Sequence, residues 1–294
     1  MRLLRWIIVV VVVLGAGVGI YMLTPVSGPA RDLTLVGDAT RGAYLIRLGG
    51  CVTCHTDPKN KAAQLAGGAG LPTPFGTFYP PNITSSKTVG IGNWTLAQFS
   101  KAMSDGEGPQ GHLYPAFPYD SYTLMSDQEI ADLHAALMAT PAIDTPSKAH
   151  EVGFPFNIRL AMAGWKHLFF KPQRFVAEAS QTDEWNRGKY IVFGPGHCVT
   201  CHSPRNFLGG LEADKELSGN PGGGPGGKTP SILKADLEKH QYTVNALVQT
   251  LTDSFTPGFD NLGGAMGEVI ADETSQWTDE DKRAVAVYLL SGAR

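Results

Sequence analysis

The sequence is poor in cysteine and carries no excess of charge of either sign. Its 294 residues contain four cysteines, 24 lysines and arginines, and 27 aspartates and glutamates, which gives a net charge of −3 at pH 7. A nearly neutral chain offers no basic surface for phosphates, so we expect no nucleic-acid partner. The few thiols also leave no material for a framework of disulfides.

All four cysteines fall in a stretch that occurs twice, Cys51-Val52-Thr53-Cys54-His55 and Cys198-Val199-Thr200-Cys201-His202. Two thiols on one helical turn can each add to a haem vinyl group, and the histidine that follows can bind the iron. A bare Cys-x-x-Cys also occurs in zinc knuckles and dithiol redox pairs, but the histidine in both copies and the lack of a spare cysteine argue against them. The sequence therefore predicts two covalent haem c groups, with the axial ligands His55 and His202.

An apolar run near the N-terminus indicates a membrane anchor. Arg2 and Arg5 precede the uncharged segment from Trp6 to Leu23, which is long enough to cross most of a bilayer as a helix. The positive charge before it predicts a cytoplasmic N-terminus and export of the rest. A cleaved signal peptide is the alternative, with a cleavage site after Ala30. We favour a retained anchor over 1–24, in a single-pass protein of the bacterial inner membrane with its haem domains in the periplasm.

The rest of the chain is predicted to be all-α, with two tandem cytochrome c domains at 38–145 and 182–294. Residues 25–37 are predicted as a linker and 146–181 as an inter-domain connection, and helices are expected near 38–48, 96–103, 127–138 and 243–253. Arg187-Gly188-Lys189-Tyr190 echoes Arg41-Gly42-Ala43-Tyr44, so the second half repeats the first. An apolar cluster at 165–170 in the connection indicates packing between the domains, or alternatively a patch for a membrane surface or a partner.

The group opposite each histidine decides the chemistry, because a methionine thioether closes the site and suits electron transfer. In the second half the candidate is Met266, in a glycine-rich segment predicted as a loop. In the first half Phe117 occupies the matching place and cannot bind iron. Met125, just before a predicted helix, is favoured there, with His112 or an open site as alternatives. Met103 and Met138 are predicted as core residues.

Several further stretches resemble the membrane-anchored multi-haem cytochrome c subunits of periplasmic dehydrogenases for alcohols, gluconate, fructose, aldehydes and N-heterocycles. The resemblance extends from about residue 38 to the end, and its matching stretches are 73–77, 82–84, Gly90-Ile91-Gly92-Asn93-Trp94-Thr95, 112–119, 185–188 and 197–206. It implies methionine at both sixth positions, electrons from a dehydrogenase partner, and quinone, a terminal oxidase or another cytochrome as acceptor. The alcohol and gluconate relatives usually carry three haem motifs, and many have methionine where Phe117 stands.

Three functions are compatible with this pattern. The first is an electron-transfer subunit that breaks no substrate bond itself. The second is a di-haem enzyme of the peroxidase type, which needs an exchangeable sixth site, as Phe117 would permit at the first haem. The third is a stand-alone shuttle between a quinol-oxidising complex and an oxidase. We favour the first. A thiosulfate-oxidising di-haem enzyme is disfavoured separately, because its cysteine ligand would need a further cysteine.

Overall fold

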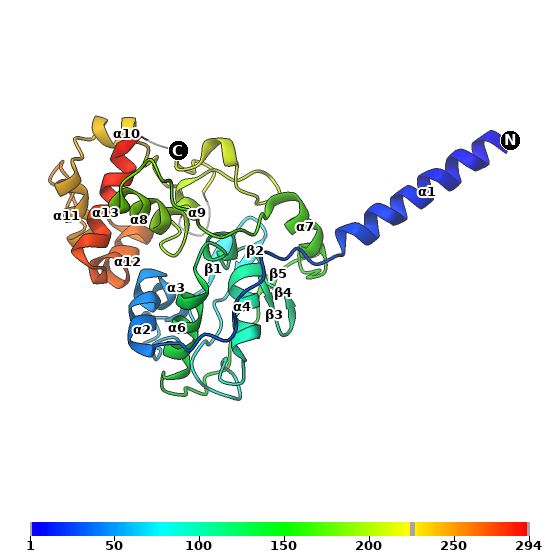
Figure 1. The fold of residues 1–294 in the computed structure, drawn as a ribbon, viewed down its shortest axis with the longest axis horizontal. Helices are drawn as coiled ribbons and strands as arrows, with labels where there is room; N and C mark the ends of the chain where they lie inside the picture. Colours follow the sequence, from blue (N-terminus) through cyan, green and yellow to red (C-terminus); the bar gives the residue numbers. More distant parts are fainter. Residues whose placement is uncertain (1, 224–226, 293–294) are drawn as a thin grey trace.

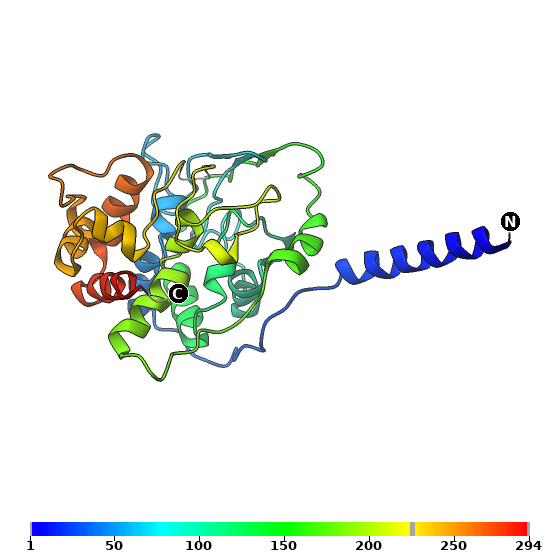
Figure 2. The same ribbon diagram turned by 90° about the horizontal axis from the view of Figure 1, so that it is seen from above.

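A long N-terminal helix stands apart from the rest of the chain in the computed structural model, which describes residues 2–223 and 227–292. This helix, α1 (Arg2–Met22), extends away from a body formed by the other elements (Figures 1 and 2). Its segment Leu4–Met22 has a mean hydropathy of 2.2 and is not buried within the protein. By length and composition α1 can cross a membrane.

The first half of the body is mainly helical. Its helices begin at residues that cap them: Asp38 accepts from the backbone of α2, and Thr95 and Ser126 form capping boxes with Gln98 and Glu129. The predicted helices are therefore confirmed. The helices are α2 (Ala39–Leu48), α3 (Cys51–His55), α4 (Leu96–Asp105), α5 (Tyr119–Tyr122) and α6 (Asp127–Met138).

The second half follows a similar order. Thr182, Thr243 and Thr278 each accept a backbone hydrogen bond at a helix start. One helix, α12, lies where a loop was predicted around Met266. The elements are α8 (Asp183–Phe193), α9 (Cys198–His202), η1 (Ala213–Lys215), α10 (Lys234–Lys239), α11 (Val244–Asp253), α12 (Gly264–Asp272), η2 (Thr274–Gln276) and α13 (Asp279–Ser291).

The chain is mostly helical, as predicted, but it also contains short strands. An antiparallel sheet has the order β1 (Leu71–Thr73), β2 (Gly76–Phe78) and β5 (Glu151–Val152), with Leu71 opposite Phe78 and Gly76 opposite Val152. β3 (Glu107–Gly108) and β4 (Gly111–His112) form a small hairpin. One hydrophobic cluster contains residues of both halves. The division into two tandem domains therefore stays a prediction.

The repeated Arg-Gly pair lies where the first helix of each half packs on the last helix of the same half. A Cβ added to Gly42 of α2 would lie 1.9 Å from the carbonyl oxygen of Asp132 on α6, and one added to Gly188 of α8 would lie 2.0 Å from that of Ala284 on α13. Only glycine permits so close an approach. The preceding arginine then reaches across: Arg41 Nε lies 2.7 Å from Asp132 Oδ2.

Two tyrosines exchange hydrogen bonds between the halves. Tyr44 of α2 donates to Asp281 of α13 at 2.6 Å, and Tyr190 of α8 donates to Glu129 of α6, also at 2.6 Å. Each acceptor is the third residue of the last helix in the opposite half. Burial raises the pKa of both tyrosines, so both hydroxyls remain protonated donors. The exchange ties the halves together at two equivalent points.

The segment predicted as a linker, 25–37, lies along the first half, where Gly28 N donates to Asp105 Oδ1 at 3.2 Å. The connection that follows the first half carries α7 (Ala161–Phe169). Trp165 of α7 is buried and donates from Nε1 to the carbonyl of Leu208 at 2.9 Å, while Lys166 donates to the carbonyl of Asp105 at 2.6 Å. These contacts agree with the prediction that this cluster packs between the halves.

Replacing Tyr44 or Tyr190 with Phe should lower the free energy of unfolding by about 1.5–3 kcal/mol each, because each removes a hydrogen bond to a carboxylate. Chemical denaturation of the haem-loaded protein measures the change. Tyr288→Phe is the matched control, since the Tyr288 hydroxyl is buried without a partner among the described residues. An equal loss in all three variants would contradict the assigned bonds.

Candidate functional site

The two Cys-x-x-Cys-His motifs form single helical turns, α3 and α9. Each turn begins after a residue in the left-handed region, Gly50 (φ 61°) and His197 (φ 36°). On such a turn the two cysteines lie on one side, with the histidine at its end. The chain reversal before each turn thus gives both motifs the same local geometry.

Both motif histidines have the same tautomer imposed by a backbone carbonyl. His55 Nδ1 lies 2.7 Å from the carbonyl oxygen of Pro81, and His202 Nδ1 lies 2.8 Å from that of Pro230. Because Nδ1 must donate its proton to the carbonyl, Nε2 is left with a free lone pair. Burial lowers the pKa of both imidazoles and favours the neutral form that binds iron.

Pro81 and Pro230 are functional positions that the sequence reasoning missed. They follow the motif histidines by 26 and 28 residues. In both places the sequence reads Pro-x-Ile, as Pro81-Asn82-Ile83 and Pro230-Ser231-Ile232. These two Pro-x-Ile stretches, at similar distances from the motif histidines, were the signal in the sequence that could have identified both positions. Proline itself cannot donate a backbone hydrogen bond, so its carbonyl is the group that acts here.

The four cysteines are half-buried. Burial raises the pKa of Cys51, Cys54 and Cys198 to about 12, and it also raises that of Cys201. Among the described residues, no group of three or more His, Cys, Asp or Glu side chains could hold a metal ion.

The surroundings of the motifs fit a covalently held haem. The cysteines are unpaired, as thioether attachment requires. The hydroxyls of Thr53 and Thr200, at the same position in each motif, are buried without a hydrogen-bond partner among the described residues. Buried hydroxyls are normally satisfied, so two unsatisfied ones at equivalent places are consistent with a missing bound group. Each motif therefore offers two thiols and one imidazole nitrogen to a haem.

Glu273 places a buried carboxyl near both motifs. Its side chain is 2 % exposed and lies within electrostatic range of cysteines in both α3 and α9. Burial in turn raises the pKa of Glu273 well above its ordinary value, so it is held as the neutral acid. A Cβ added to Gly50 would lie 2.4 Å from Glu273 Oε2, which is a second reason for glycine there.

The starts of the two motifs lie side by side through Tyr122. The Tyr122 hydroxyl donates to the carbonyl of Gly49, two residues before Cys51, at 2.8 Å. Its ring meets that of His197, directly before Cys198, edge to face with centroids 5.7 Å apart. The segments that lead into the two haem motifs are therefore neighbours, although 147 positions separate the cysteines (198 − 51).

Met125 lies in the apolar core just before α6. Its side chain is 1 % exposed and belongs to the cluster shared by both halves. Phe117 packs against the same cluster, and its ring lies 5.3 Å from that of Tyr122, centroid to centroid. Phe117 thus fills space with an aromatic ring, and Met125 is the thioether that this part of the first half offers.

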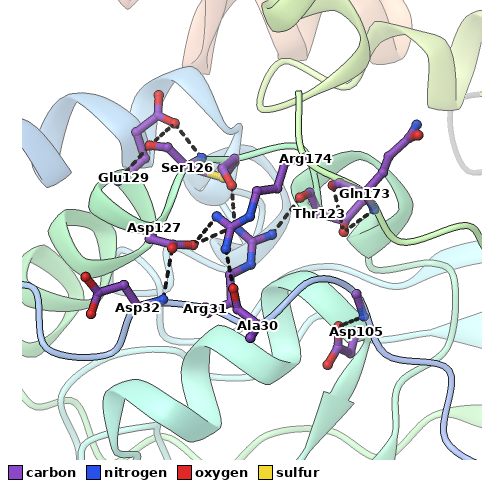
Figure 3. A network of polar contacts seen from close by, with 12 residues as sticks. Ala30, Arg31, Asp32, Asp105, Thr123, Ser126, Asp127, Glu129, Gln173 and Arg174 are labelled. Atoms are coloured by element: carbon purple, nitrogen blue, oxygen red, sulfur yellow. Dashed lines mark hydrogen bonds and ion pairs between the residues drawn. The ribbon is translucent and has the colours of Figure 1, made fainter. Parts of the chain in front are cut away.

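Arg31, from the segment that follows α1, holds the backbone on both sides of this methionine. Its guanidinium donates to the carbonyls of Met125 at 2.5 Å and Thr123 at 2.6 Å. Figure 3 shows Arg31 beside Thr123 and Asp127. Asp127 binds both Arg31 and Arg174, and Arg174 donates to the carbonyl of Ala30 at 2.6 Å. Several charge-assisted bonds therefore fix the chain around Met125, and no sequence pattern indicated them.

Met266 is the third residue of α12 and is half-buried against the shared core. The prediction of a loop here was wrong, because the glycines at 263 and 264 start a helix. Gly263 is the N-cap residue, and Gly264 has φ 59°. Met266 therefore projects from a regular turn. Its role as a ligand stays a prediction, as does that of Met125.

The alternative ligands have other contacts. His112 Nδ1 lies 3.2 Å from Lys166 Nζ. Met103 is buried on α4, and Met138 packs against the core from α6, as predicted for core residues. His134 Nε2 meets the carbonyl of Trp94 at 3.0 Å.

No protein-family model matches the sequence. Curated relatives do. The chain is 39% identical over 283 residues to a diheme cytochrome c-type protein of Cereibacter sphaeroides, an alignment that spans 95% of this chain and 94% of the relative.

Two further relatives are cytochrome subunits of dehydrogenases. The chain is 37% identical over 258 residues to the fructose dehydrogenase cytochrome subunit of Gluconobacter japonicus, covering 86% of this chain and 52% of the relative. It is 35% identical over 272 residues to the cytochrome c subunit of alcohol dehydrogenase (quinone) of Gluconacetobacter polyoxogenes, covering 90% and 57%. The chain thus spans about half the length of these two subunits.

Replacing Met125 with Ala should remove the methionine-type spectrum of one haem and lower its midpoint potential by on the order of 0.1 V, because a thioether ligand raises the potential. Met266→Ala should do the same at the other haem. Spectroelectrochemical titration resolves both effects, with the core variant Met103→Leu as control. An unchanged first haem in Met125→Ala would exclude that residue and favour an open site.

Replacing Arg31 with Gln should lower the free energy of unfolding by about 1–3 kcal/mol, because two carbonyls lose a charged donor. It should also shift the potential of the haem that Met125→Ala affects, and redox titration with denaturation measures both. Arg283→Gln is the control, since Arg283 makes an exposed ion pair with Glu184. A stability loss without any change in potential would limit Arg31 to a structural role.

Proposed function

The chain belongs to a family of c-type cytochromes that includes a diheme cytochrome c and the cytochrome c subunits of alcohol, fructose and gluconate dehydrogenases, and on this premise we propose that it carries electrons from a periplasmic dehydrogenase to the respiratory chain. A quinone, a terminal oxidase or another cytochrome accepts them. The carrier is anchored in the bacterial inner membrane by α1, with its haem domains on the periplasmic side.

The proposed site residues either attach a haem covalently or bind its iron. Cys51 and Cys54 would hold one haem c as thioethers, and Cys198 and Cys201 would hold the other. His55 and His202 would offer Nε2 to the irons, and Met125 and Met266 would offer their thioether sulfurs. When bound, the haem groups supply one-electron oxidation and reduction.

The observation that carries the proposal is the contact between the starts of the two motifs. Tyr122 joins Gly49 to His197, and Glu273 lies near the cysteines of both motifs. Electron exchange weakens steeply with separation, so two sites held side by side suit transfer within one chain. The contacts that hold the halves together fix this separation while the carrier meets its partners.

The surroundings of Met125 support a carrier over an enzyme of the peroxidase type. A peroxidase needs a sixth position that a small molecule can reach. Met125 is 1 % exposed, and Arg31 fixes its backbone carbonyl. A thioether held in this way keeps water and peroxide away from the first site.

The anchor supports a carrier that works beside membrane-bound partners. Confinement to the membrane surface raises the effective concentration of the chain near a dehydrogenase or oxidase in the same bilayer. A stand-alone shuttle would use the same anchor. The identity of the electron donor therefore distinguishes a dehydrogenase subunit from a stand-alone shuttle.

Mild detergent extraction from native membranes, followed by mass spectrometry, tests the proposal. We expect a dehydrogenase to co-purify and its substrate to reduce both haems, with alcohols, aldehydes, sugar acids and quinol as the panel. Reduction by quinol-fed complexes alone would favour the shuttle. Peroxide turnover by the isolated chain would contradict the carrier and indicate an open first haem.

A further inference from the structure

The helix α7 lies directly at the base of α1. A Cβ added to Gly164 of α7 would lie 3.7 Å from Met22 Cε, and His167 Nε2 meets the carbonyl of Thr24 at 3.0 Å. The rings of Tyr21 and His167 have centroids 4.6 Å apart. Both ribbon views show α7 on the side of the body from which α1 leaves (Figures 1 and 2). Any bilayer that α1 crosses therefore begins beside α7.

Large apolar side chains are exposed around this point. Phe154 is 81 % exposed and Phe207 is 87 % exposed. Trp165 and Phe170 of the same region are buried, so packing between the halves accounts for only part of the apolar cluster. We call the exposed apolar residues of this region the basal apolar face. They are Phe154, Phe156, Ile158, Leu160, Leu168, Phe207 and Leu208.

Contacts join the basal apolar face into one surface across both halves. Trp165 of α7 donates to the carbonyl of Leu208, and a Cβ added to Gly210 would lie 2.4 Å from the Phe169 ring. A Cβ added to Gly209 would lie 3.0 Å from the ring of Phe75. The Phe75 ring packs edge to face on Phe156, with centroids 5.0 Å apart. The loop after the second motif, α7 and the 154–160 segment therefore adjoin one another at the base of α1.

The charge of this segment is of one sign. Residues 153–171 contain no aspartate or glutamate. Of their three basic residues, Lys166 is 1 % exposed and donates to backbone carbonyls of the first half, and Arg159 donates to the carbonyl of His112. Lys171 is exposed, directly after the buried Phe170. Apolar side chains beside basic ones are the combination that binds the boundary between headgroups and acyl chains in anionic membranes.

We propose that the basal apolar face lies in the interface of the bilayer that α1 crosses, with Phe154 and Phe207 inserted among acyl chains and Lys171 at anionic phospholipid headgroups. The inference rests on the anchor in the proposed function and goes beyond electron transfer. A lipid surface is favoured over a protein partner because the span itself brings the bilayer to this face. An exposed apolar surface of this kind otherwise marks an interaction site whose occupant is open.

Docking of this face fixes the orientation of both halves. Lys166 of α7 donates to the carbonyls of Asp105 and Gly106 in the first half, while Trp165 binds Leu208 of the second. A face that rests on the membrane therefore prevents the body from swinging about the end of α1. The surfaces turned away from the bilayer would remain available to a donor.

Photo-crosslinking of the full-length, haem-loaded chain tests the proposal. p-Benzoylphenylalanine replaces Phe154 or Phe207, and the protein is placed in nanodiscs of phosphatidylethanolamine and phosphatidylglycerol. Phe259 is the matched control, since it is 89 % exposed and lies between α11 and α12, at the end of the body away from α1 (Figure 1). After irradiation, mass spectrometry of the peptides measures lipid adducts, and the haem spectrum confirms folding.

We expect lipid adducts at positions 154 and 207 in several-fold higher yield than at position 259. Equally low yields at all three positions, in a chain of full mass, would overturn the docked face but leave the anchor intact. Protein adducts in place of lipid at position 154 in native membranes would overturn it in favour of a partner. A mature mass that lacks α1 would overturn the anchor and the docked face together, while haem reduction by a dehydrogenase would still report on electron transfer separately.

Discussion

The structure depends on a reciprocal pair of hydrogen bonds between its halves. Tyr44 binds Asp281 and Tyr190 binds Glu129, each at 2.6 Å, so that the first helix of each half holds the first turn of the last helix in the other. The same tyrosines follow the Arg-Gly pairs that let those helices pack closely. One repeated four-residue pattern thus sets both the packing within each half and the contact between them.

The haem motifs receive their geometry from this frame. α3 follows α2 and α9 follows α8, so holding these helices together brings the two motif starts to either side of Tyr122. This arrangement buries the carboxyl of Glu273 near the cysteines of both motifs. Burial raises the pKa of Glu273, so that the carboxyl stays neutral. An ionised carboxylate would be expensive in such surroundings.

The N-terminal segment contacts the first half in addition to carrying the apolar helix α1. Arg31 reaches the carbonyls around Met125, and α7 packs against the end of α1. The proposed anchor is therefore continuous with the groups that fix the proposed sixth ligand and with the basal apolar face. In a protein that α1 anchors to a bilayer, these neighbouring contacts would resist both movement of the body against the bilayer and distortion of the first site.

Local chemistry in the sequence was sufficient to indicate the haem attachment residues, the capped helices such as α6, and the apolar span. Each of these is set by neighbours within a few positions: thiol spacing, a side chain that caps a helix, or an unbroken apolar run. The bonds of Arg31 to the backbone around Met125 and the carbonyls of Pro81 and Pro230 beside the motif histidines were decided by tertiary structure alone. So was the contact between the motif starts. These contacts join residues from 26 to 94 positions apart, and no local pattern specifies which distant groups meet.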